Sequence, residues 1–406
     1  MNILILTSIY PQEDDEENVG VTLVVKYFAR EWIKAGHNII VIHNSSRYPQ
    51  LLYLLPDSLL KKVNSKLGIV IPNRGQFKKI KSISDGVICY RIPMFKLIPK
   101  NIYSSFRTNK QFKEIINILR CEKFSPDVIL GHWENPQIQL LPMLKREFKV
   151  KTAIVLHSLV YIKQKRYIRW AKKHVKGIDV IGARSKAIAS QVKELLSLEK
   201  EPFICYSGID DKYFEYEGFG DADFSKKEPN SYLFVGRLIK RKNVDSTMIA
   251  LKASYKEKDF SYNIVGQGAE QDRLMSLRES LMLNDNVKFL GYKNRDEVLK
   301  IMANMEVFIM ISDNETFGLV YIEAMSRGCI VIASKDGGMD GIIVHGNNGF
   351  LCEQGNEYEL ERILEVIKNM TCEEKLKISD NAIQTALNFK DSKVAERYLD
   401  SIIDWY

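Results

Sequence analysis

The sequence lacks the features that mark secreted, disulfide-bonded or membrane-spanning proteins. Its six cysteines are scattered through 406 residues without a Cys-x-x-Cys pair, so we expect reduced thiols, several of them packed as small apolar groups. No uninterrupted apolar run reaches the roughly 18 residues of a membrane span. The chain enters an apolar stretch at residues 2–6 with no basic segment before it, unlike a signal peptide. A cytoplasmic protein without a transmembrane helix is therefore expected.

Metal-binding spacing is also absent. No cluster of His, Cys and Asp has the spacing of a zinc or calcium site, and no internal repeat or low-complexity tract stands out. With 45% hydrophobic and 27% charged residues, the composition is ordinary for a globular protein, and the length favours two or three domains. We expect neither a metal nor a cofactor.

Short apolar segments alternate with longer amphipathic ones, a pattern that indicates βα units and parallel sheets. Two doubly wound domains are therefore predicted, with ligands bound beyond the carboxyl ends of the strands. In the first half, strands are predicted at residues 2–7, 38–43, 87–91, 127–131, 152–156 and 178–182. In the second half, they are predicted at residues 203–206, 231–235, 260–265, 286–290, 306–311 and 329–333, with a short apolar patch at 349–352.

Two carboxylates, Glu315 and Glu323, stand with seven residues between them, directly after one of the predicted strands. A helix is expected to begin near Thr316 and to end at Gly328, which can take the left-handed C-terminal position. Its amino end, with free amides and an open Gly318, suits a phosphate or diphosphate. A largely helical interval would separate the carboxylates by about 10 Å, which suits two ends of one extended ligand better than a pair sharing a proton.

Two cations, Arg237 and Lys242, follow the strand predicted at residues 231–235. They stand at the carboxyl end of a strand, where a guanidinium and an ammonium would neutralise a diphosphate. Preorganised cations and helix amides stabilise the charge that grows on a leaving diphosphate without needing a metal. The alternative interpretation is a solvated basic turn at residues 240–242.

The Glu-x7-Glu element resembles the donor-site motif of the retaining glycosyltransferases of family 4, which have the two-domain GT-B architecture. Other blocks agree with that family in order and spacing over nearly the whole chain. They are residues 11–20, Ala35-Gly36-His37, Val155-Leu156-His157, Ser207-Gly208-Ile209-Asp210 with Phe214, Val235-Gly236-Arg237-Leu238 with Lys242-Asn243, Val265-Gly266-Gln267-Gly268-Ala269-Glu270 and Phe289-Leu290-Gly291.

The resemblance implies an α/β protein with the GT-B architecture, in which two Rossmann-like doubly wound parallel-sheet domains face each other across a cleft. Residues 1–203 are then the acceptor-side domain, and residues 204–389 are the nucleotide-sugar-binding domain. A C-terminal helix at residues 390–406 is expected to cross back and pack on the first domain.

The resemblance also implies roles for single residues. Glu315 and His157 are the expected catalytic residues, both at the donor sugar. Glu323 is expected to bind the ribose. The remaining assignments are Phe317 and Gly318 at the donor sugar, Gly20, Arg237, Lys242, Leu319 and Val320 at the donor diphosphate, Tyr292 and Lys293 at the base, and His132 on the acceptor side.

The chemistry of Glu315 and His157 has alternatives. A retaining enzyme can use a carboxylate as a covalent nucleophile, but the family is described by a front-face mechanism, so Glu315 is interpreted as positioning the sugar and stabilising charge. His157 is expected to hydrogen-bond a sugar hydroxyl, with base catalysis left open. Without the motif context, Glu315 and Glu323 would be surface acids and His157 a structural residue. The chain departs from the family pattern at Ser207 and Arg184, which affects acceptor-side and hinge details.

The implied function is retaining transfer of a sugar from a nucleoside-diphosphate sugar, with UDP as the default nucleotide, to a hydroxyl of a glycan or lipid-linked acceptor. Such a hexosyltransferase would serve surface polysaccharide or glycolipid synthesis. The alternatives are a GT-B nucleotide-sugar epimerase and a non-catalytic protein that binds a nucleotide sugar or a glycan. The intact set of Glu315, Glu323, Arg237 and Lys242 weighs against a non-catalytic protein.

The net charge of +8 is unevenly distributed. Residues 161–176 contain seven Lys or Arg and no acid, interleaved with aromatic and aliphatic residues, and residues 51–67 also mix apolar residues with lysines. Both stretches suit an anionic membrane surface, which would make this a peripheral protein on the inner face of the cytoplasmic membrane. The alternative is that residues 161–176 form one helix with a solvated basic face and an apolar core face. No nucleic-acid-binding motif accompanies the charge, so no nucleic-acid partner is expected.

Overall fold

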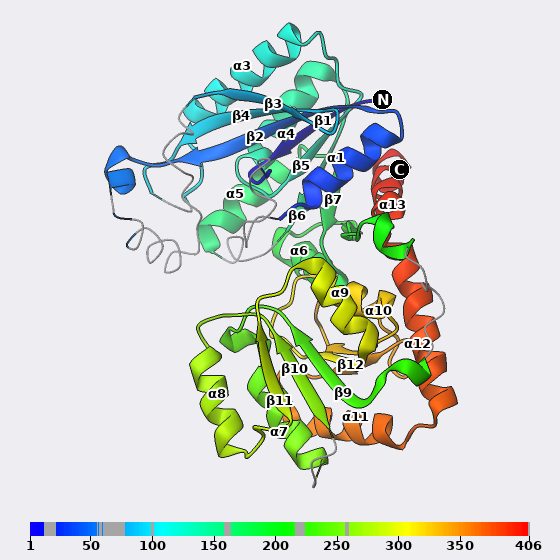
Figure 1. Cartoon of the computed structure of the whole chain (residues 1–406). Coiled ribbons are helices and arrows are strands. Elements are labelled where there is room, and N and C mark those ends of the chain that lie inside the picture. The colour runs from blue at the N-terminus through cyan, green and yellow to red at the C-terminus, as the bar shows by residue number, and fades with distance from the viewer. Residues whose placement is uncertain are drawn as a thin grey trace. The chain divides into compact units, whose positions relative to one another are not determined.

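The computed structural model describes residues 1–11, 22–54, 56, 59, 78–98, 101–157, 164–215, 224–255 and 260–404. The chain divides into two compact units (Figure 1). The first unit comprises Met1–Arg184, Ile188–Cys205 and Ala395–Tyr406, and the second comprises Ser185–Ala187 and Tyr206–Val394. Gly20 and most of the stretches at 11–20 and 51–67 lie outside the described residues.

The first unit is built on an eight-stranded sheet in the order β3-β4-β2-β1-β5-β6-β7-β8. All pairs are parallel except β3 with β4. The strands are β1 (Asn2–Thr7), β2 (Asn38–Arg47), β3 (Ile80–Ser84), β4 (Val87–Phe95), β5 (Val128–His132), β6 (Lys151–Leu156), β7 (Val180–Ala183) and β8 (Phe203–Ile204).

Two of these strands correct the sequence prediction. β3 was not predicted, because it is an edge strand whose residues are largely exposed and therefore lacks the buried apolar run that marks the other strands. β8 was assigned to the second half of the chain, but it pairs with β7 in the first sheet. The other strands predicted for the first half are present.

Helices cover both faces of the first sheet. Helices α3 (Ser105–Cys121), α4 (Gln137–Phe148), α5 (Lys165–Val175) and α6 (Lys186–Leu196) contribute to one apolar cluster with residues of β1, β2, β5 and β6. The C-terminal helix α13 (Asp391–Ile403) lies beside α1 (Val24–Lys34) (Figure 1). Trp32 Nε1 donates a hydrogen bond to the carbonyl of Ala395 at 2.9 Å, and the Tyr398 ring packs against Phe28 and Trp32. The predicted return of the C-terminal helix to the first domain is confirmed from Ala395 onward.

Helix α5 shows how the described part of the basic stretch at 161–176 is arranged. Tyr167, Ala171 and Val175 are buried in the core of the first unit, and Trp170 packs edge-on against Tyr167. The apolar face of the helix therefore belongs to the protein core, and its basic face is solvated. Among the helices of the described residues, none combines the length and the apolar character needed to span a membrane.

The second unit contains a six-stranded sheet in the order β11-β10-β9-β12-β13-β14, with every pair parallel. From β9 the chain winds outward to β10 and β11, and it then crosses to β12 on the other side. The carboxyl ends of β9 and β12 therefore flank the topological switch point, where ligands bind in open α/β sheets. The strands are β9 (Glu228–Val235), β10 (Ser261–Val265), β11 (Val287–Gly291), β12 (Met305–Met310), β13 (Ile330–Ser334) and β14 (Phe350–Cys352).

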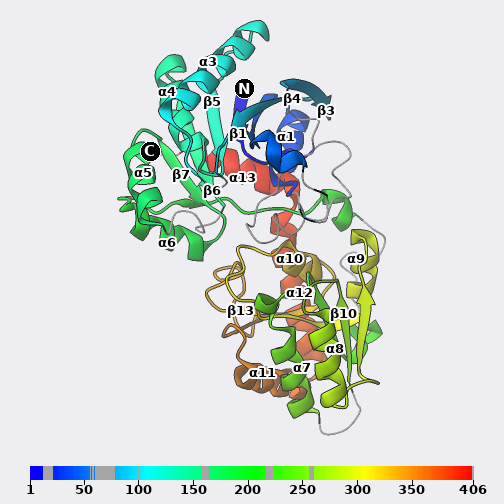
Figure 2. The same cartoon turned by 90° about the vertical axis from the view of Figure 1, so that its left-hand side faces the viewer.

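Six α-helices of the described residues accompany this sheet. Figure 1 and Figure 2 both show α9 and α10 together at one end of the unit, and these two helices are in contact. The helices are α7 (Val244–Ser254), α8 (Gln271–Ser280), α9 (Arg295–Asn304), α10 (Leu319–Ser326), α11 (Glu357–Asn369) and α12 (Cys372–Ala386).

A buried lysine, Lys227, ties α9 and α10 to the start of β12. Its Nζ donates hydrogen bonds to the carbonyls of Met302, Met305 and Arg327 at 3.4, 2.9 and 3.0 Å, and to that of Ala303 at 3.2 Å. The last carbonyls of a helix have no partner within the helix, so a cation at this place satisfies two helix ends at once. Burial lowers the pKa of Lys227, and nearby Cys329 and Glu306 partly oppose that effect.

Replacing Lys227 by Met should destabilise the second unit by about 3 kcal/mol, because the charged donor that joins these buried carbonyls would be lost. Scanning calorimetry of the two proteins measures the effect. Lys252→Met, at an exposed position of α7, is the matched control and should change the stability by less than about 0.5 kcal/mol. Equal stabilities for Lys227→Met and the wild type would show that the ammonium does not hold these helix ends.

Candidate functional site

An ion pair stands at the switch point of the second sheet. Lys242 lies in a short 3-10 turn, Lys240–Lys242, after β9, and Glu315 lies in the loop after β12. Lys242 Nζ is 2.6 Å from Glu315 Oε2, and Arg241 Nη1 is 3.1 Å from the same oxygen. The other oxygen, Oε1, makes no hydrogen bond with the described residues and remains available. The structure thus brings together two of the predicted site residues.

The basic turn is anchored to the end of β12 by backbone and amide hydrogen bonds. Asn243 Nδ2 donates to the carbonyl of Ile311 at 2.9 Å and to Asp313 Oδ1 at 2.8 Å. The amide of Asp313 donates to the carbonyl of Arg241 at 2.8 Å. The positions of Lys242 and Glu315 are therefore set by the backbone of two neighbouring strand ends.

The two charges of this pair are nearly enclosed, since the side chains of Lys242 and Glu315 are 10% and 13% exposed. Burial alone would raise the pKa of Glu315, but the Lys242 ammonium and the Arg241 guanidinium outweigh it and hold that pKa below its ordinary value. Burial lowers the pKa of Lys242, and Glu315 opposes this. Glu315 is therefore an ionised carboxylate at neutral pH.

Helix α10 begins at Leu319, three residues later than predicted. Gly318 has φ 80° and ψ 76°, a left-handed conformation that ends the loop and starts the helix. A Cβ at this residue would lie 2.6 Å from the Tyr321 ring, so only glycine fits. The amides of Leu319 and Val320 make no hydrogen bond within the described part of the chain. The amino end of α10 is open and carries partial positive charge.

Arg237 lies in the loop after β9. The backbone of this loop packs closely against the backbone of the loop that follows β10. The amide of Leu238 donates to the carbonyl of Gln267 at 3.0 Å. A Cβ at Gly268 would lie 2.1 Å from the Leu238 carbonyl oxygen, which explains the Gly-x-Gly pattern at 266–268. Arg237 itself is exposed and makes no ion pair with the residues that the structure describes.

Phe317 does not present its side chain to a ligand. It is 4% exposed, and its ring packs against Tyr206 and Phe389 with centroids 5.7 and 6.0 Å away. Burial by these two rings anchors the loop that carries Glu315. Any contact between Phe317 and a donor sugar therefore has to come from its backbone.

The predicted ribose ligand, Glu323, is paired with an arginine that the sequence did not single out. Arg295 Nη2, at the start of α9, is 2.7 Å from Glu323 Oε1, and its guanidinium stacks over the Tyr213 ring at 4.7 Å. Arg241 was likewise not assigned to the site. Arg241 could have been assigned to the site from the sequence, because it is next to Lys242. Nothing in the residues around Arg295 indicates that it pairs with Glu323.

The two residues predicted to contact the base of the nucleotide have different surroundings. Tyr292, directly after β11, is 60% exposed. Lys293 forms an ion pair with Glu297 at 3.4 Å. Both positions are open to solvent at the edge strand of the sheet.

The two predicted histidines meet in the first unit, at the carboxyl ends of β5 and β6. His132 Nδ1 and His157 Nε2 are 2.9 Å apart, and the Trp133 ring stacks on His157 with centroids 3.9 Å apart. His157 is half-buried, whereas His132 is completely buried. The side chain of His132 therefore contacts other side chains rather than an open surface.

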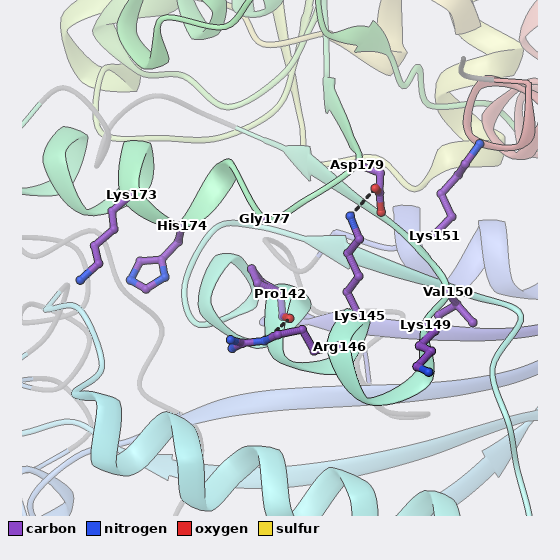
Figure 3. Close-up of a pocket in the computed structure, with 10 residues that line it drawn as sticks. All are labelled: Pro142, Lys145, Arg146, Lys149, Val150, Lys151, Lys173, His174, Gly177 and Asp179. Carbon is purple, nitrogen blue, oxygen red and sulfur yellow. Dashed lines mark hydrogen bonds and ion pairs between the residues drawn. The ribbon is translucent and has the colours of Figure 1, made fainter.

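A hollow of about 750 Å³ lies in the first unit, between α4, α5 and the start of β6. It contains none of the predicted site residues, and it lies at the amino ends of the strands, opposite the two histidines. Lys145 is bound to Asp179, and Figure 3 shows Lys149, Lys151 and Lys173 pointing in different directions. These cations do not converge on one anion.

No metal centre is evident in the described ranges, where no group of three or more His, Cys, Asp and Glu side chains could hold a metal ion. The expectation that the protein needs no metal stays a prediction.

The ion pair predicts a pH-dependent stability. The pKa of Glu315 is lowered from 4.5, so the pair contributes stability above that pH and loses it as the pH falls through the folded-state pKa. Glu315→Gln leaves Lys242 without its partner and should cost about 2 kcal/mol at pH 7. The difference from wild type, measured by calorimetry, should shrink as the pH falls through the lowered pKa of Glu315. The exposed Glu279→Gln serves as the control, and a pH-independent deficit for Glu315→Gln would contradict the assignment.

Comparison with known sequences relates the second unit to sugar-transferring proteins. Residues 221–385 match the family described as Glycosyl transferases group 1. An uncharacterised glycosyltransferase of Methanocaldococcus jannaschii is 29% identical over 313 residues, which cover 75% of this chain and 77% of that protein. N-acetyl-alpha-D-glucosaminyl L-malate synthase of Bacillus anthracis is 31% identical over 185 residues, 44% of this chain and 47% of the relative.

Solved structures show the same fold. HepE of Anabaena, in complex with UDP, aligns with a TM-score of 0.69 and 17% identity over 100% of both chains. The lipopolysaccharide outer core galactosyltransferase WaaB aligns with a TM-score of 0.67 and 17% identity over 100% of this chain and 99% of its own. At such identities the likeness concerns the fold alone. The chain has the GT-B fold, and its residues 221–385 are similar to the family described as Glycosyl transferases group 1.

Proposed function

We propose that the protein is a retaining glycosyltransferase that transfers a sugar from a nucleoside-diphosphate sugar, with UDP as the nucleotide, to a hydroxyl of a glycan or lipid-linked acceptor. The observation that carries this proposal is the open amino end of α10 beside the Lys242–Glu315 ion pair, at the switch point of the second sheet. The group 1 domain and the glycosyltransferase relatives support the reaction class. The complexes of HepE with UDP and with UDP-glucose support the choice of nucleotide.

Three kinds of hydrogen-bond donor are assigned to the diphosphate. The amides of Leu319 and Val320 point out of the amino end of α10, Lys242 supplies a largely buried ammonium, and Arg237 supplies a guanidinium that no described residue occupies. Charge-assisted hydrogen bonds from such groups stabilise an oxyanion most where water is excluded. This arrangement can compensate the charge of the leaving diphosphate without a metal.

The reaction proceeds on one face of the sugar in this proposal. The bond from the anomeric carbon to the diphosphate oxygen breaks, and its electron pair leaves with UDP. The acceptor hydroxyl oxygen bonds to the same face of the carbon, and its proton passes to the leaving phosphate. Glu315, held ionised by Lys242 and Arg241, positions the sugar and stabilises positive charge on it. Glu323, oriented by Arg295, binds the ribose.

The function is tested by mixing the protein with UDP-, GDP- and ADP-sugars and a panel of glycan and glycolipid acceptors. We expect release of UDP that depends on an acceptor and persists in EDTA. Nuclear magnetic resonance of the product should show the anomeric configuration of the donor. Donor binding without UDP release, or conversion of the donor into its epimer, would favour the alternatives, and inversion would exclude the retaining mechanism.

Arg237→Ala should lower kcat by about 100-fold, because it removes one preorganised cation from the leaving group. Steady-state release of UDP measures the effect. Arg362→Ala removes an exposed arginine of α11 and should leave turnover unchanged. Wild-type turnover in Arg237→Ala would remove this residue from the site.

We also propose that the basic face of α5 attracts an anionic membrane surface. The exposed cations Arg166, Arg169 and Lys173 lie on this helix, while its apolar residues are in the core. The association is therefore electrostatic, without insertion of the helix, and it should weaken with salt. Leu51 and Leu54, which are 79% and 76% exposed, supply apolar surface in the other stretch.

Replacing Arg166, Arg169 and Lys173 together by Gln should weaken binding to phosphatidylglycerol vesicles by about 100-fold, since each cation near such a surface contributes about 1 kcal/mol. Vesicle sedimentation at two salt concentrations measures the affinity. The control removes three exposed cations of the second unit, Lys252, Arg362 and Lys377. If the control loses as much vesicle affinity, binding depends on the net charge of the protein and not on the basic face of α5.

A further inference from the structure

A chain of three side chains from three separate elements ends at His157. Tyr398, on the C-terminal helix α13, has its hydroxyl 3.2 Å from His132 Nε2. His132, the last residue of β5, has its Nδ1 2.9 Å from His157 Nε2. Tyr398 and His132 are 2% and 0% exposed, so water cannot substitute for either partner. All three residues belong to the first unit.

The direction of the hydrogen bonds follows from the burial of Tyr398. Within the described residues, the only hydrogen-bond partner of its hydroxyl is His132 Nε2. If that hydroxyl accepted a hydrogen bond from His132 Nε2–H, its own O–H would stay buried and unsatisfied, at a cost of about 1–3 kcal/mol. It therefore donates, and His132 Nε2 accepts. A neutral imidazole that accepts at Nε2 carries its proton at Nδ1, so His132 donates to His157 Nε2.

The same reasoning fixes the proton of His157. Since its Nε2 accepts from His132, a neutral His157 carries its proton at Nδ1. That nitrogen makes no hydrogen bond with any residue that the structure describes. Both imidazoles are kept neutral, because burial and the nearby Arg184 guanidinium lower the pKa of His132 to about 3 and lower that of His157 as well.

Neighbouring residues hold the hydrogen-bonded side chains of His132 and His157 in one arrangement. The ring of Trp133 stacks on His157 with an interplanar angle of 15°, and the amide of Trp133 donates to the carbonyl of Val155 at 3.2 Å. Gln137 Nε2 donates to the carbonyl of His132 at 2.7 Å. Neither imidazole can rotate freely between these contacts.

We propose that Tyr398 and His132 are positioning residues, which fix His157 in the Nδ1–H tautomer and aim that N–H at a ligand oxygen. His157 then acts as a hydrogen-bond donor and not as a base. That the ligand is the sugar of the donor substrate rests on the proposed function. The C-terminal helix thereby becomes part of the site in the first unit.

The tautomer is measured on protein labelled with ¹⁵N-histidine, in long-range ¹H–¹⁵N correlation spectra, with His157→Ala used to assign the signals. We expect His157 to show a protonated Nδ1 and an unprotonated Nε2. In Tyr398→Phe the hydroxyl donor is lost, so the His157 signals should move toward a mixture of tautomers. Tyr103→Phe removes another buried hydroxyl of the same unit, bonded to Ser46, and should leave the His157 signals unchanged.

Activity gives a second, separate readout. Tyr398→Phe should lower kcat/KM for the nucleotide sugar by about tenfold, comparable to the loss of one hydrogen bond, and should leave inhibition by free UDP unchanged, because His157 acts on the sugar. In a His132→Leu background the Tyr398 substitution should add little, since both residues act through one chain.

The proposal is overturned if wild-type His157 carries its proton on Nε2, or if Tyr398→Phe leaves the tautomer unchanged. A calorimetric check that Tyr398→Phe folds like wild type keeps the first readout valid even when His132→Leu does not fold. If the spectra are as expected but the wild type turns over no nucleotide sugar, the proposed function fails while the positioning chain stands.

Discussion

The candidate site of the second unit is organised by one ion pair, between Lys242 and Glu315, at the carboxyl ends of two neighbouring parallel strands. Charges buried to this extent are unfavourable unless each is paired and held in place, and the anchoring of the basic turn through Asn243 and Asp313 provides that geometry. The arrangement keeps the carboxylate ionised and places an ammonium beside the open end of α10. The ion pair, the partial positive charge at the amino end of α10 and the switch point of the sheet therefore lie at the same place in the second unit.

Much of the fold was predictable because its strands are buried and apolar. β12 and β13 are fully buried, and apart from Glu306 and Ser334 their residues are apolar. β3 escaped prediction because an exposed edge strand has no such run, and β8 was assigned to the wrong half because a two-residue strand at a boundary does not indicate which sheet it joins. The start of α10 was misplaced because Gly318 adopts a left-handed conformation that delays the helix to Leu319, and the spacing of apolar residues does not show this conformation.

Residues of the candidate site could be named from the sequence where they belong to a local motif, and they were missed where their place depends on tertiary contacts. Glu315 and Lys242 come from separate motifs, and the structure joins them. Arg295 and Tyr398 carried no signal, because each acts through a partner far along the chain, Glu323 and His132 respectively. Phe317 was assigned to the sugar from its place in the motif, but its ring is used for packing, so motif membership predicts position better than it predicts what the side chain contacts.

A common pattern links the two units. Glu315 has one oxygen bound by cations and the other free of hydrogen bonds within the described chain, and His157 has one nitrogen bound by His132 and the other free. In each case the protein immobilises one end of the group and leaves the opposite atom without a hydrogen bond among the described residues, so little reorganisation would be needed if the proposed ligand binds there. Arg237 is different, because it is exposed and unpaired among the described residues, and ordering its side chain costs up to about 2 kcal/mol. In the proposed function, the contribution of Arg237 must therefore come from the charge of the bound diphosphate itself, whereas Glu315 and His157 are already held in place by the residues around them.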